Sequence, residues 1–255
     1  MKSPVVVIGI GELGAVFARG LLRTGHPVFP VTRETDMALE SASLPDPELV
    51  LLAVAEKDLH PTLEGIPAPW RERLVLLQNE LLPRDWERHG IEQPTVISVW
   101  FEKKKGMDSK VLLPSPACGP AAETLHAALA SIDIPVRVLD DREALLFELV
   151  VKNVYILTTN IAGLEVGGTV SSLWRDHQNL ARAVAADVIA IQAHLTGRDF
   201  DTEALIRGML AAFEGDPDHG CMGRSAPARL QRALALADEA GLEVPTLRRI
   251  AAAHP

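Results

Sequence analysis

The stretch "PVVVIGIGELGAVFARGLLRTGHPVFPVTR", residues 4–33, decides the fold of this protein. Its β-branched run at 4–10 predicts a strand, the helical spacing at 12–25 predicts a helix that ends at Gly25, and 26–33 predicts a second strand. A strand, a helix and a second strand in this order form a βαβ unit, whose two strands run parallel.

Three glycines stand where the first strand meets the helix, in the pattern G-x-G-x-x-G: Gly9, Gly11 and Gly14. In a dinucleotide-binding turn Gly9 would permit the tight turn, Gly11 would let the backbone approach a pyrophosphate, and Gly14 would allow close contact between helix and strand. The pattern therefore predicts dinucleotide binding. A glycine-rich turn that serves only packing is the alternative that the residues leave open.

The second strand ends in "FPVTRE", which places Arg33 where the cofactor's ribose is recognised. An acidic residue there accepts hydrogen bonds from the ribose of NAD, whereas an arginine accommodates the 2′-phosphate of NADP. Arg33 comes first and Glu34 follows, so NADPH is the expected cofactor. Because 25 of the 255 residues are Lys or Arg, a basic residue standing here by chance remains the alternative.

The rest of the chain changes character near residue 140. Before that point, apolar runs at 48–55, 73–79, 95–101, 110–115 and 134–140 predict further strands, with a helix at 120–132. The segment 34–48 is too short for both a full helix and a strand. The polar "EKKKGMD" between 95–101 and 110–115 predicts a hairpin, so the sheet is expected to be mixed.

After residue 140 the strand patterns end and helical periods take over, at 142–165, 171–196, 201–214, 226–241 and 245–253. The predicted fold class is therefore α/β: a Rossmann-like mixed-sheet domain at 1–140 that binds NADP, followed by an all-helical substrate or dimerisation domain at 141–255. No flexible linker separates them, which predicts tight packing around a cleft.

Composition excludes several classes of function. The formal net charge is −9 and the longest basic run is Lys103-Lys104-Lys105, expected to be solvated, so no nucleic-acid partner is predicted. The apolar runs are too short for a membrane span, and the start of the chain predicts no cleaved leader. Cys118 and Cys221 lie far apart, which favours a reducing, cytoplasmic compartment. His219 and Cys221 straddle Gly220 without further ligands at suitable spacing, so no metal site is expected.

The first long helical pattern, "FELVVKNVYILTTNIAGL" at 147–164, carries Lys152 in an apolar run. Burying an ammonium costs free energy unless it is paired or reaches solvent. Glu148 precedes it by four residues, a spacing that allows a solvated helix ion pair worth about 0.2–0.5 kcal/mol. The other interpretation is that Lys152 stabilises and protonates an alkoxide. Asn153 is expected on the helix surface or between the domains.

Several segments in combination resemble the ketopantoate reductase (2-dehydropantoate 2-reductase) family of NADPH-dependent enzymes. They are the glycine turn followed by Arg33, "LLQNELL" at 76–82, Lys152 followed eight residues later by Asn160, and "AGLEVPTLRRI" at 240–250. The resemblance implies that the three glycines hold the pyrophosphate and Arg33 the 2′-phosphate. It implies that Asn79 lies near the nicotinamide and substrate, that Lys152 is catalytic, and that Asn160 binds substrate.

The implied activity is reduction of a small 2-oxo acid, 2-dehydropantoate to pantoate in pantothenate biosynthesis, and a homodimer is compatible with it. The sequence departs from the family at three positions. Ile156 replaces an asparagine, Glu80 replaces the glycine after Asn79, and Ser225 stands where the family has a catalytic glutamate. In the loop at 216–225, Arg224 or Ser225 is expected to contact a carboxylate or phosphate of the substrate. Two rival functions remain: an NAD(P)-dependent oxidoreductase with another substrate, and a catalytically silent NADP-binding regulator.

Overall fold

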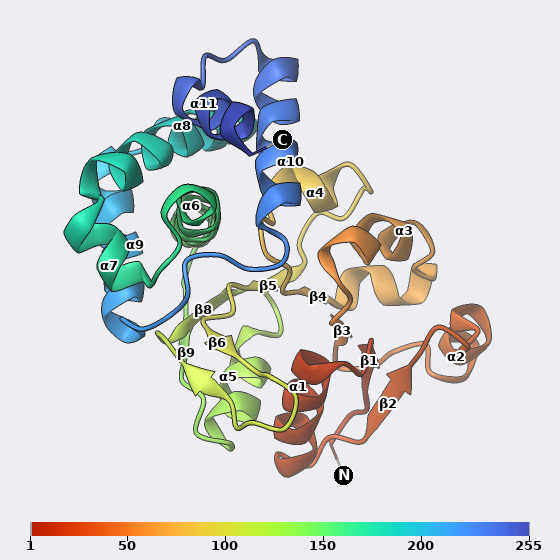
Figure 1. Cartoon of the computed structure of the whole chain (residues 1–255). Coiled ribbons are helices and arrows are strands. Elements are labelled where there is room, and N and C mark those ends of the chain that lie inside the picture. The colour runs from red at the N-terminus through yellow and green to blue at the C-terminus, as the bar shows by residue number, and fades with distance from the viewer. Residues whose placement is uncertain (1, 255) are drawn as a thin grey trace. The chain divides into compact units, whose positions relative to one another are not determined.

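The computed structural model describes residues 2–254, which form two compact units. The first unit ends at Glu148 and contains the sheet, and the second begins at Leu149 and is built from helices (Figure 1). An α/β unit followed by a helical unit confirms the predicted fold class. The division between the units falls inside one long helix, α6 (Arg142–Val166).

The first unit is organised around a seven-stranded sheet with the order β2-β1-β3-β4-β5-β8-β9. β1 to β5 run parallel, β8 pairs antiparallel with β5, and β9 runs parallel to β8, so the sheet is mixed as predicted. The strands are β1 (Val5–Ile8), β2 (Val28–Val31), β3 (Val50–Leu52), β4 (Leu74–Leu76), β5 (Thr95–Ile97), β8 (Ser115–Cys118) and β9 (Val136–Val138).

β1 lies between β2 and β3 in the parallel part of the sheet. Val5 pairs with Val28 of β2 on one side, and Val6 pairs with Val50 of β3 on the other. After β1 the chain forms β2 on one side and then crosses over to form β3 on the other side, so the strand order reverses at β1. In doubly wound sheets, ligands bind outside the carboxyl ends of the strands at such a point.

Helices α1 (Glu12–Arg23) and α5 (Ala122–Ala130) cover one face of the sheet. They pack against each other closely, because a Cβ on Gly20 would lie 2.5 Å from the carbonyl oxygen of Ala128. Buried side chains of alternate strand positions meet these helices in one hydrophobic core, including Val5, Val7, Phe17, Leu51, Val75, Ile97, Leu125 and Leu129. Burial of this set supplies the main favourable free energy of the unit.

The short helices of the first unit are α2 (Met37–Ser43), η1 (Glu56–Asp58), α3 (Leu59–Glu64), η2 (Ala68–Arg73) and α4 (Pro83–Glu87). α2 lies within the segment 34–48 and is capped by Asp36, whose carboxylate accepts hydrogen bonds from the amides of Ala38 and Leu39. The fully buried Trp70 donates its indole N–H to the carbonyl of Leu44 at 2.8 Å. These elements connect the parallel strands without adding to the sheet.

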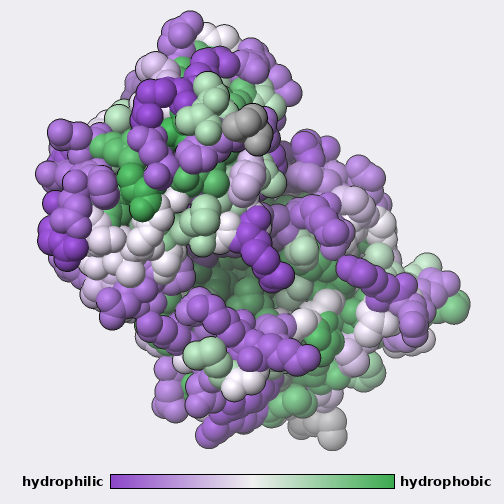
Figure 2. Space-filling view, viewed as in Figure 1, coloured by the Kyte–Doolittle hydropathy of each residue, from purple (hydrophilic) through white to green (hydrophobic). Residues whose placement is uncertain are grey.

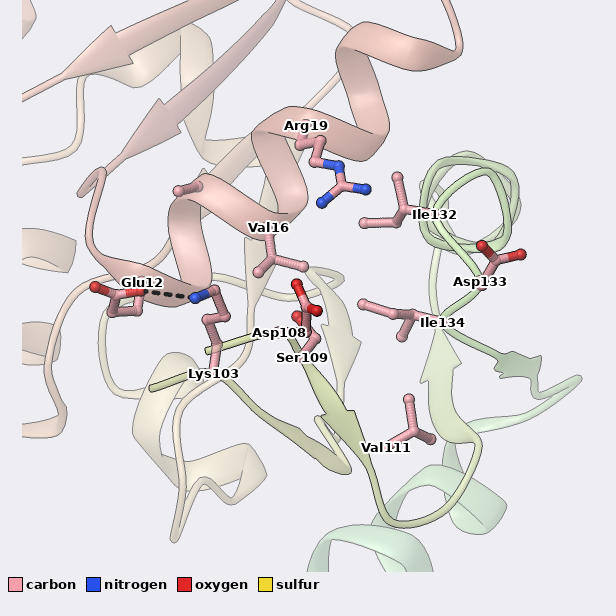
Figure 3. Close-up of a pocket in the computed structure, with 11 residues that line it drawn as sticks. Glu12, Val16, Arg19, Lys103, Asp108, Ser109, Val111, Ile132, Asp133 and Ile134 are labelled. Carbon is pink, nitrogen blue, oxygen red and sulfur yellow. Dashed lines mark ion pairs between the residues drawn. The ribbon is translucent and has the colours of Figure 1, made fainter. Parts of the chain in front are cut away.

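The predicted hairpin exists but is smaller than its sequence pattern suggests. β6 (Phe101–Glu102) and β7 (Lys110–Val111) pair antiparallel with each other, whereas β5 and β8 join the main sheet. Lys103, in the hairpin loop, lies with its Nζ 3.5 Å from the Glu12 carboxylate, and its side chain is 22% exposed. Lys104 and Lys105 are exposed as expected, whereas Lys103 is only partly solvated, because the loop folds back onto the start of α1 (Figure 3).

A pocket of about 470 Å³ lies beside this ion pair, between α1, the hairpin and residues 132–134 (Figure 3). Its lining combines charged groups, among them Arg19, with the apolar side chains of Val16, Ile132 and Ile134. None of the glycines of the predicted dinucleotide turn lines it.

The second unit contains α6 from Leu149 onward, α7 (Val170–Asp176), α8 (Gln178–Thr196), α9 (Thr202–Gly215), α10 (Ala226–Ala240) and α11 (Pro245–Ala253). The prediction of one helix over 171–196 is wrong, because His177 (φ −132°, ψ 33°) separates α7 from α8. Thr169 caps α7 by accepting a hydrogen bond from the amide of Ser172, which explains the early helix start.

α6 is the core of this unit, with α7 to α10 around it in Figure 1. Gly208 of α9 allows close approach, because a Cβ there would lie 2.7 Å from a methyl group of Val151. By length and composition α6 could cross a membrane, but 83% of its most apolar window is buried, as in the core helix of a soluble protein. Polar side chains cover much of the visible surface of each unit (Figure 2).

Candidate functional site

The glycine turn between β1 and α1 contains two glycines that the protein itself requires. Gly9 has φ +92°, a left-handed conformation, and a Cβ on it would lie 2.8 Å from the carbonyl oxygen of Ala53. A Cβ on Gly14 would lie 2.0 Å from the carbonyl oxygen of Gly9. Any side chain at either position would displace backbone at the carboxyl ends of β1 and β3.

Gly11 behaves differently from its neighbours. It caps α1 in an extended conformation (φ −82°, ψ −166°) that any residue adopts, and a Cβ on it would meet nothing within 4 Å. The fold therefore does not need glycine at this position. The open space beside its backbone, at the positive end of α1, suits the approach of a pyrophosphate.

Arg33 follows the edge strand β2 in a tight turn. Its side chain is 93% exposed, and its Nη2 lies 3.7 Å from the Asp58 carboxylate. The turn is held by the hydroxyl of Thr35, which accepts a hydrogen bond from the amide of Thr32 at 3.0 Å. A long ion pair between exposed groups contributes little free energy, so the guanidinium is able to exchange Asp58 for an anionic ligand.

Asn79 lies just beyond the carboxyl end of β4 and donates a hydrogen bond to the Glu56 carboxylate at 2.9 Å. The buried Gln78 beside it donates to the carbonyls of Leu52 and Val54 at 2.8 and 3.3 Å. Sequence reasoning named Asn79 but missed Glu56 and Gln78. Gln78 could have been recognised from the sequence, because it forms a pair of carboxamides with Asn79 directly after a buried strand. No neighbouring residue in the sequence indicates the role of Glu56.

Glu80 has φ +59°, one of two non-glycine residues in the described chain with a positive φ. This is the position where the resemblance leads one to expect glycine. A left-handed conformation costs a residue with a Cβ about 1–2 kcal/mol relative to glycine. The backbone after Asn79 thus keeps the conformation that glycine favours although the side chain has changed.

In the second unit, α6 carries Lys152 and Asn160, which are buried with 7% and 8% of their surface exposed. Lys152 is therefore not solvated, as it would be in the surface ion pair with Glu148 that the sequence allowed. Glu148, its expected ion-pair partner, accepts a bond from Arg137. Asn153 is also buried and donates to Gln192 of α8 at 2.9 Å, so its expected place on the helix surface is wrong.

Asn160 is held on both sides of its carboxamide. Its Nδ2 donates to the carbonyl of Ile156 at 2.8 Å, and its Oδ1 accepts from Nη1 of Arg229 on α10 at 3.2 Å. Ser225 precedes α10, is exposed, and makes no capping bond with its side chain. Arg229 was missed by sequence reasoning, because it is 69 residues from Asn160.

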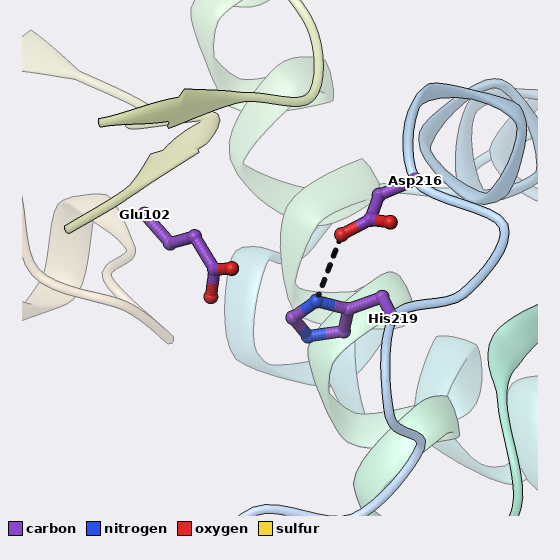
Figure 4. A group of neighbouring side chains, drawn as sticks. All are labelled: Glu102, Asp216 and His219. Atoms are coloured by element: carbon purple, nitrogen blue, oxygen red, sulfur yellow. Dashed lines mark ion pairs between the residues drawn. The ribbon is translucent and has the colours of Figure 1, made fainter. Parts of the chain in front are cut away.

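The loop before α10 is fastened to the segment that follows α6. The amide of Cys221 donates to the carbonyl of Gly168 at 3.0 Å, and the amide of Val170 donates to the carbonyl of His219 at 2.9 Å. The His219 ring faces the buried Asp216, with Nδ1 and the carboxylate 3.4 Å apart (Figure 4). Burial raises the pKa of the Cys221 thiol to about 11.

No protein-family model matches the chain, and no curated protein matches it. Solved structures do. A ketopantoate reductase from Ralstonia eutropha superposes with a TM-score of 0.69 at 18% sequence identity, over 97% of this chain and 96% of that one. A 2-dehydropantoate 2-reductase from Methylococcus capsulatus gives a TM-score of 0.69 at 15% identity, over 98% and 94%.

A D-mandelate dehydrogenase solved in complex with NADH is similar to the same degree, with a TM-score of 0.69 at 11% identity over 97% of this chain and 96% of that one. The matches cover nearly the whole of each chain, so they include both units. The resemblance to ketopantoate reductases inferred from the sequence is confirmed at the level of the fold.

Proposed function

We propose that this protein is an NADPH-dependent reductase of a small 2-oxo acid, with ketopantoate (2-dehydropantoate) as the first substrate to test. The observation that carries the proposal is the difference among the three glycines. Gly9 and Gly14 are required by backbone contacts within the protein, whereas Gly11 has open space where a side chain would be. Gly11 stands at the N-terminus of α1, so this open space lies where backbone amides and the positive end of the helix can bind a pyrophosphate.

The residues that would hold the cofactor all belong to the first unit. Gly9, Gly11 and Gly14 would frame the pyrophosphate at the start of α1, and Arg33 would bind the 2′-phosphate of NADPH with its exposed guanidinium. Asn79 would lie near the nicotinamide. The D-mandelate dehydrogenase of the same fold was solved with NADH. NADH is therefore the alternative cofactor, and Arg33 is the residue that argues against it.

Apart from Asn79, which would also lie near the substrate, the residues that would bind and protonate the substrate belong to the second unit. When bound, the nicotinamide supplies a hydride to a carbonyl carbon, which leaves negative charge on the carbonyl oxygen. Lys152 would stabilise that charge and donate the proton that completes the alcohol. Asn160 lies eight residues further, about 12 Å along α6, and would bind another part of the substrate. Ser225 would contact the substrate from the start of α10.

A 2-oxo acid is the substrate class that this set of groups favours. A lysine and carboxamide donors together stabilise a developing alkoxide and bind acceptor oxygens, whereas hydrolysis would require an activated nucleophile. The resemblance points to ketopantoate within this class and to a cytoplasmic enzyme of pantothenate biosynthesis. The ketopantoate reductase from Staphylococcus aureus, which has the same fold, is dimeric. A homodimer is accordingly proposed for this chain.

The test is to follow NADPH absorbance with purified protein, ketopantoate and a panel of other 2-oxo acids, and to repeat the assay with NADH. Oxidation of NADPH with ketopantoate is the expected result. Oxidation only with another acid would transfer the assignment to a related reductase. NADPH binding without turnover of any acid would instead favour a regulatory protein. Ile156 and Ser225 support that alternative, because they replace an asparagine and a catalytic glutamate of the ketopantoate reductase family.

A further inference from the structure

Arg229 is a buried cation at the beginning of α10, with 9% of its surface exposed. Its Nη1 lies 3.2 Å from Oδ1 of Asn160 on α6. Burying a guanidinium costs free energy unless its N–H groups donate to acceptors. The hydrogen bond to Asn160 is therefore part of how the unit folds and not a chance contact of a flexible side chain. The amide of Arg229 also donates to the carbonyl of Ser225 at 2.9 Å, which fixes its place in the first turn of α10.

The contacts of Asn160 permit only one orientation of its carboxamide. A guanidinium can only donate hydrogen bonds and a backbone carbonyl can only accept them. Oδ1 of Asn160 faces the guanidinium of Arg229, and Nδ2 faces the carbonyl of Ile156 at 2.8 Å. Rotating the amide by 180° would set N–H against N–H and oxygen against oxygen, so both hydrogen bonds would be lost.

This orientation determines what Asn160 can offer to a ligand. Its Oδ1 already accepts a hydrogen bond from the Arg229 guanidinium. One Nδ2 hydrogen is committed to Ile156. The second Nδ2 hydrogen is left as a donor, and the Arg229 guanidinium bonded to Oδ1 polarises and strengthens it.

We propose that Arg229 is a positioning residue that holds Asn160 as a hydrogen-bond donor, and thereby selects a substrate that presents an anionic oxygen at this position. The proposal rests on the proposed function in taking Asn160 as a substrate-binding residue. It adds that the group bound there is the carboxylate of the 2-oxo acid, because a polarised N–H beside a buried guanidinium binds an anion better than a neutral acceptor. Arg229 acts through Asn160 and does not need to touch the substrate.

A double-mutant cycle tests the proposal. Steady-state kinetics with NADPH would compare the wild type, R229M, N160A and the double variant on ketopantoate and on pyruvate, with pyruvamide as the matched neutral substrate. We expect R229M to raise KM for the two acids about tenfold or more. We also expect it to change kcat by less than about threefold and to leave KM for pyruvamide nearly unchanged. In the N160A background R229M should have almost no further effect on KM.

Additive effects of the two substitutions, or an equal loss of acid and amide, would overturn the proposal, because a residue that only supports packing would act in this way. R229K is expected to restore most of the affinity for the acids. If R229M does not fold, R229Q takes its place in the cycle, since glutamine keeps an N–H donor and removes the charge. R248M is the control, because Arg248 is exposed and pairs with Asp238 at 2.7 Å within the same unit.

Calorimetric titration of ketopantoate into the same four proteins separates this proposal from the function it rests on. If the protein shows no turnover, but R229M and N160A weaken ketopantoate binding and the double variant weakens it no further, the reductase is refuted and the role of Arg229 is retained. Turnover with an additive cycle would retain the reductase and refute the role. Absence of both binding and turnover would refute both.

Discussion

A Cβ atom on Gly14 would lie 2.0 Å from the carbonyl oxygen of Gly9, whereas a Cβ on Gly11, between them, would meet nothing within 4 Å. The turn therefore contains two kinds of glycine in one motif. The first kind is required for the chain to fold, and the second leaves space that no group of the protein fills. Substitution by alanine separates these roles experimentally.

Gly14→Ala is expected to destabilise the protein by more than about 3 kcal/mol, because the backbone at Gly9 must move to admit the methyl group. Gly11→Ala is expected to change the free energy of unfolding by less than about 1 kcal/mol, yet to weaken NADPH binding about tenfold or more. Urea denaturation and fluorescence titration with NADPH measure the two quantities. Intact NADPH affinity in Gly11→Ala would refute the dinucleotide site.

Arg33→Ala is expected to weaken NADPH binding about tenfold or more and to leave NADH binding nearly unchanged, because a charge-assisted bond to the 2′-phosphate contributes about 1.5–3 kcal/mol. Titration of both cofactors against the wild type and the variant measures the difference. Arg23→Ala, at the last turn of α1, serves as the control for general loss of positive charge. An equal loss for both cofactors would show that Arg33 does not recognise the phosphate.

Lys152→Ala is expected to lower the turnover number by about 10²–10⁴, because the developing alkoxide loses its proton donor. NADPH affinity should remain close to that of the wild type. Lys152→Met, which fills the buried space without the charge, should lose turnover to the same extent and keep more of the stability. Single-turnover assays and thermal unfolding measure these effects. A wild-type rate in either variant would remove Lys152 from the mechanism.

Glu80→Gly is expected to be more stable than Glu80→Ala by about 1 kcal/mol, because glycine adopts φ +59° without the strain imposed by a Cβ. Both variants lose the same carboxylate, so their comparison isolates the backbone contribution. Urea denaturation of the two proteins measures it. If the alanine variant were equally stable, the left-handed conformation at this position would carry no cost.

The two cysteine thiols are expected to react slowly with a disulfide reagent in the native protein at pH 8. Burial raises the pKa of Cys118 and raises that of Cys221 to about 11, and only the thiolate attacks. At pH 8 about one thousandth of Cys221 would be thiolate, a fraction that grows tenfold for each pH unit toward 11. Labelling should become complete in urea. Cys118→Ser and Cys221→Ser assign each reaction, and rapid labelling of native protein would contradict the burial.

The elements that the sequence predicts well are those whose pattern is local. The β-branched run before Gly9, the helical period after Gly11 and the apolar period around Lys152 each show their periodicity within a few turns, and β1, α1 and α6 appear in the structure. The break at His177 was missed because the apolar period continues through it. The separation of β5 from the hairpin depends on which partner each strand finds.

The chemical identities of the candidate site were present in the sequence: a glycine turn, an arginine after the second strand, a lysine and an asparagine on one apolar helix. Their partners were not. Glu148 was expected beside Lys152 but bonds to Arg137, and Asn160 is oriented by Arg229 from another helix. Periodicity and residue type act over neighbouring residues and can therefore be recognised from the chain alone. Burial, amide orientation and the pairing of distant charges are decided when helices pack, because only then do residues far apart in sequence compete for the same hydrogen bonds.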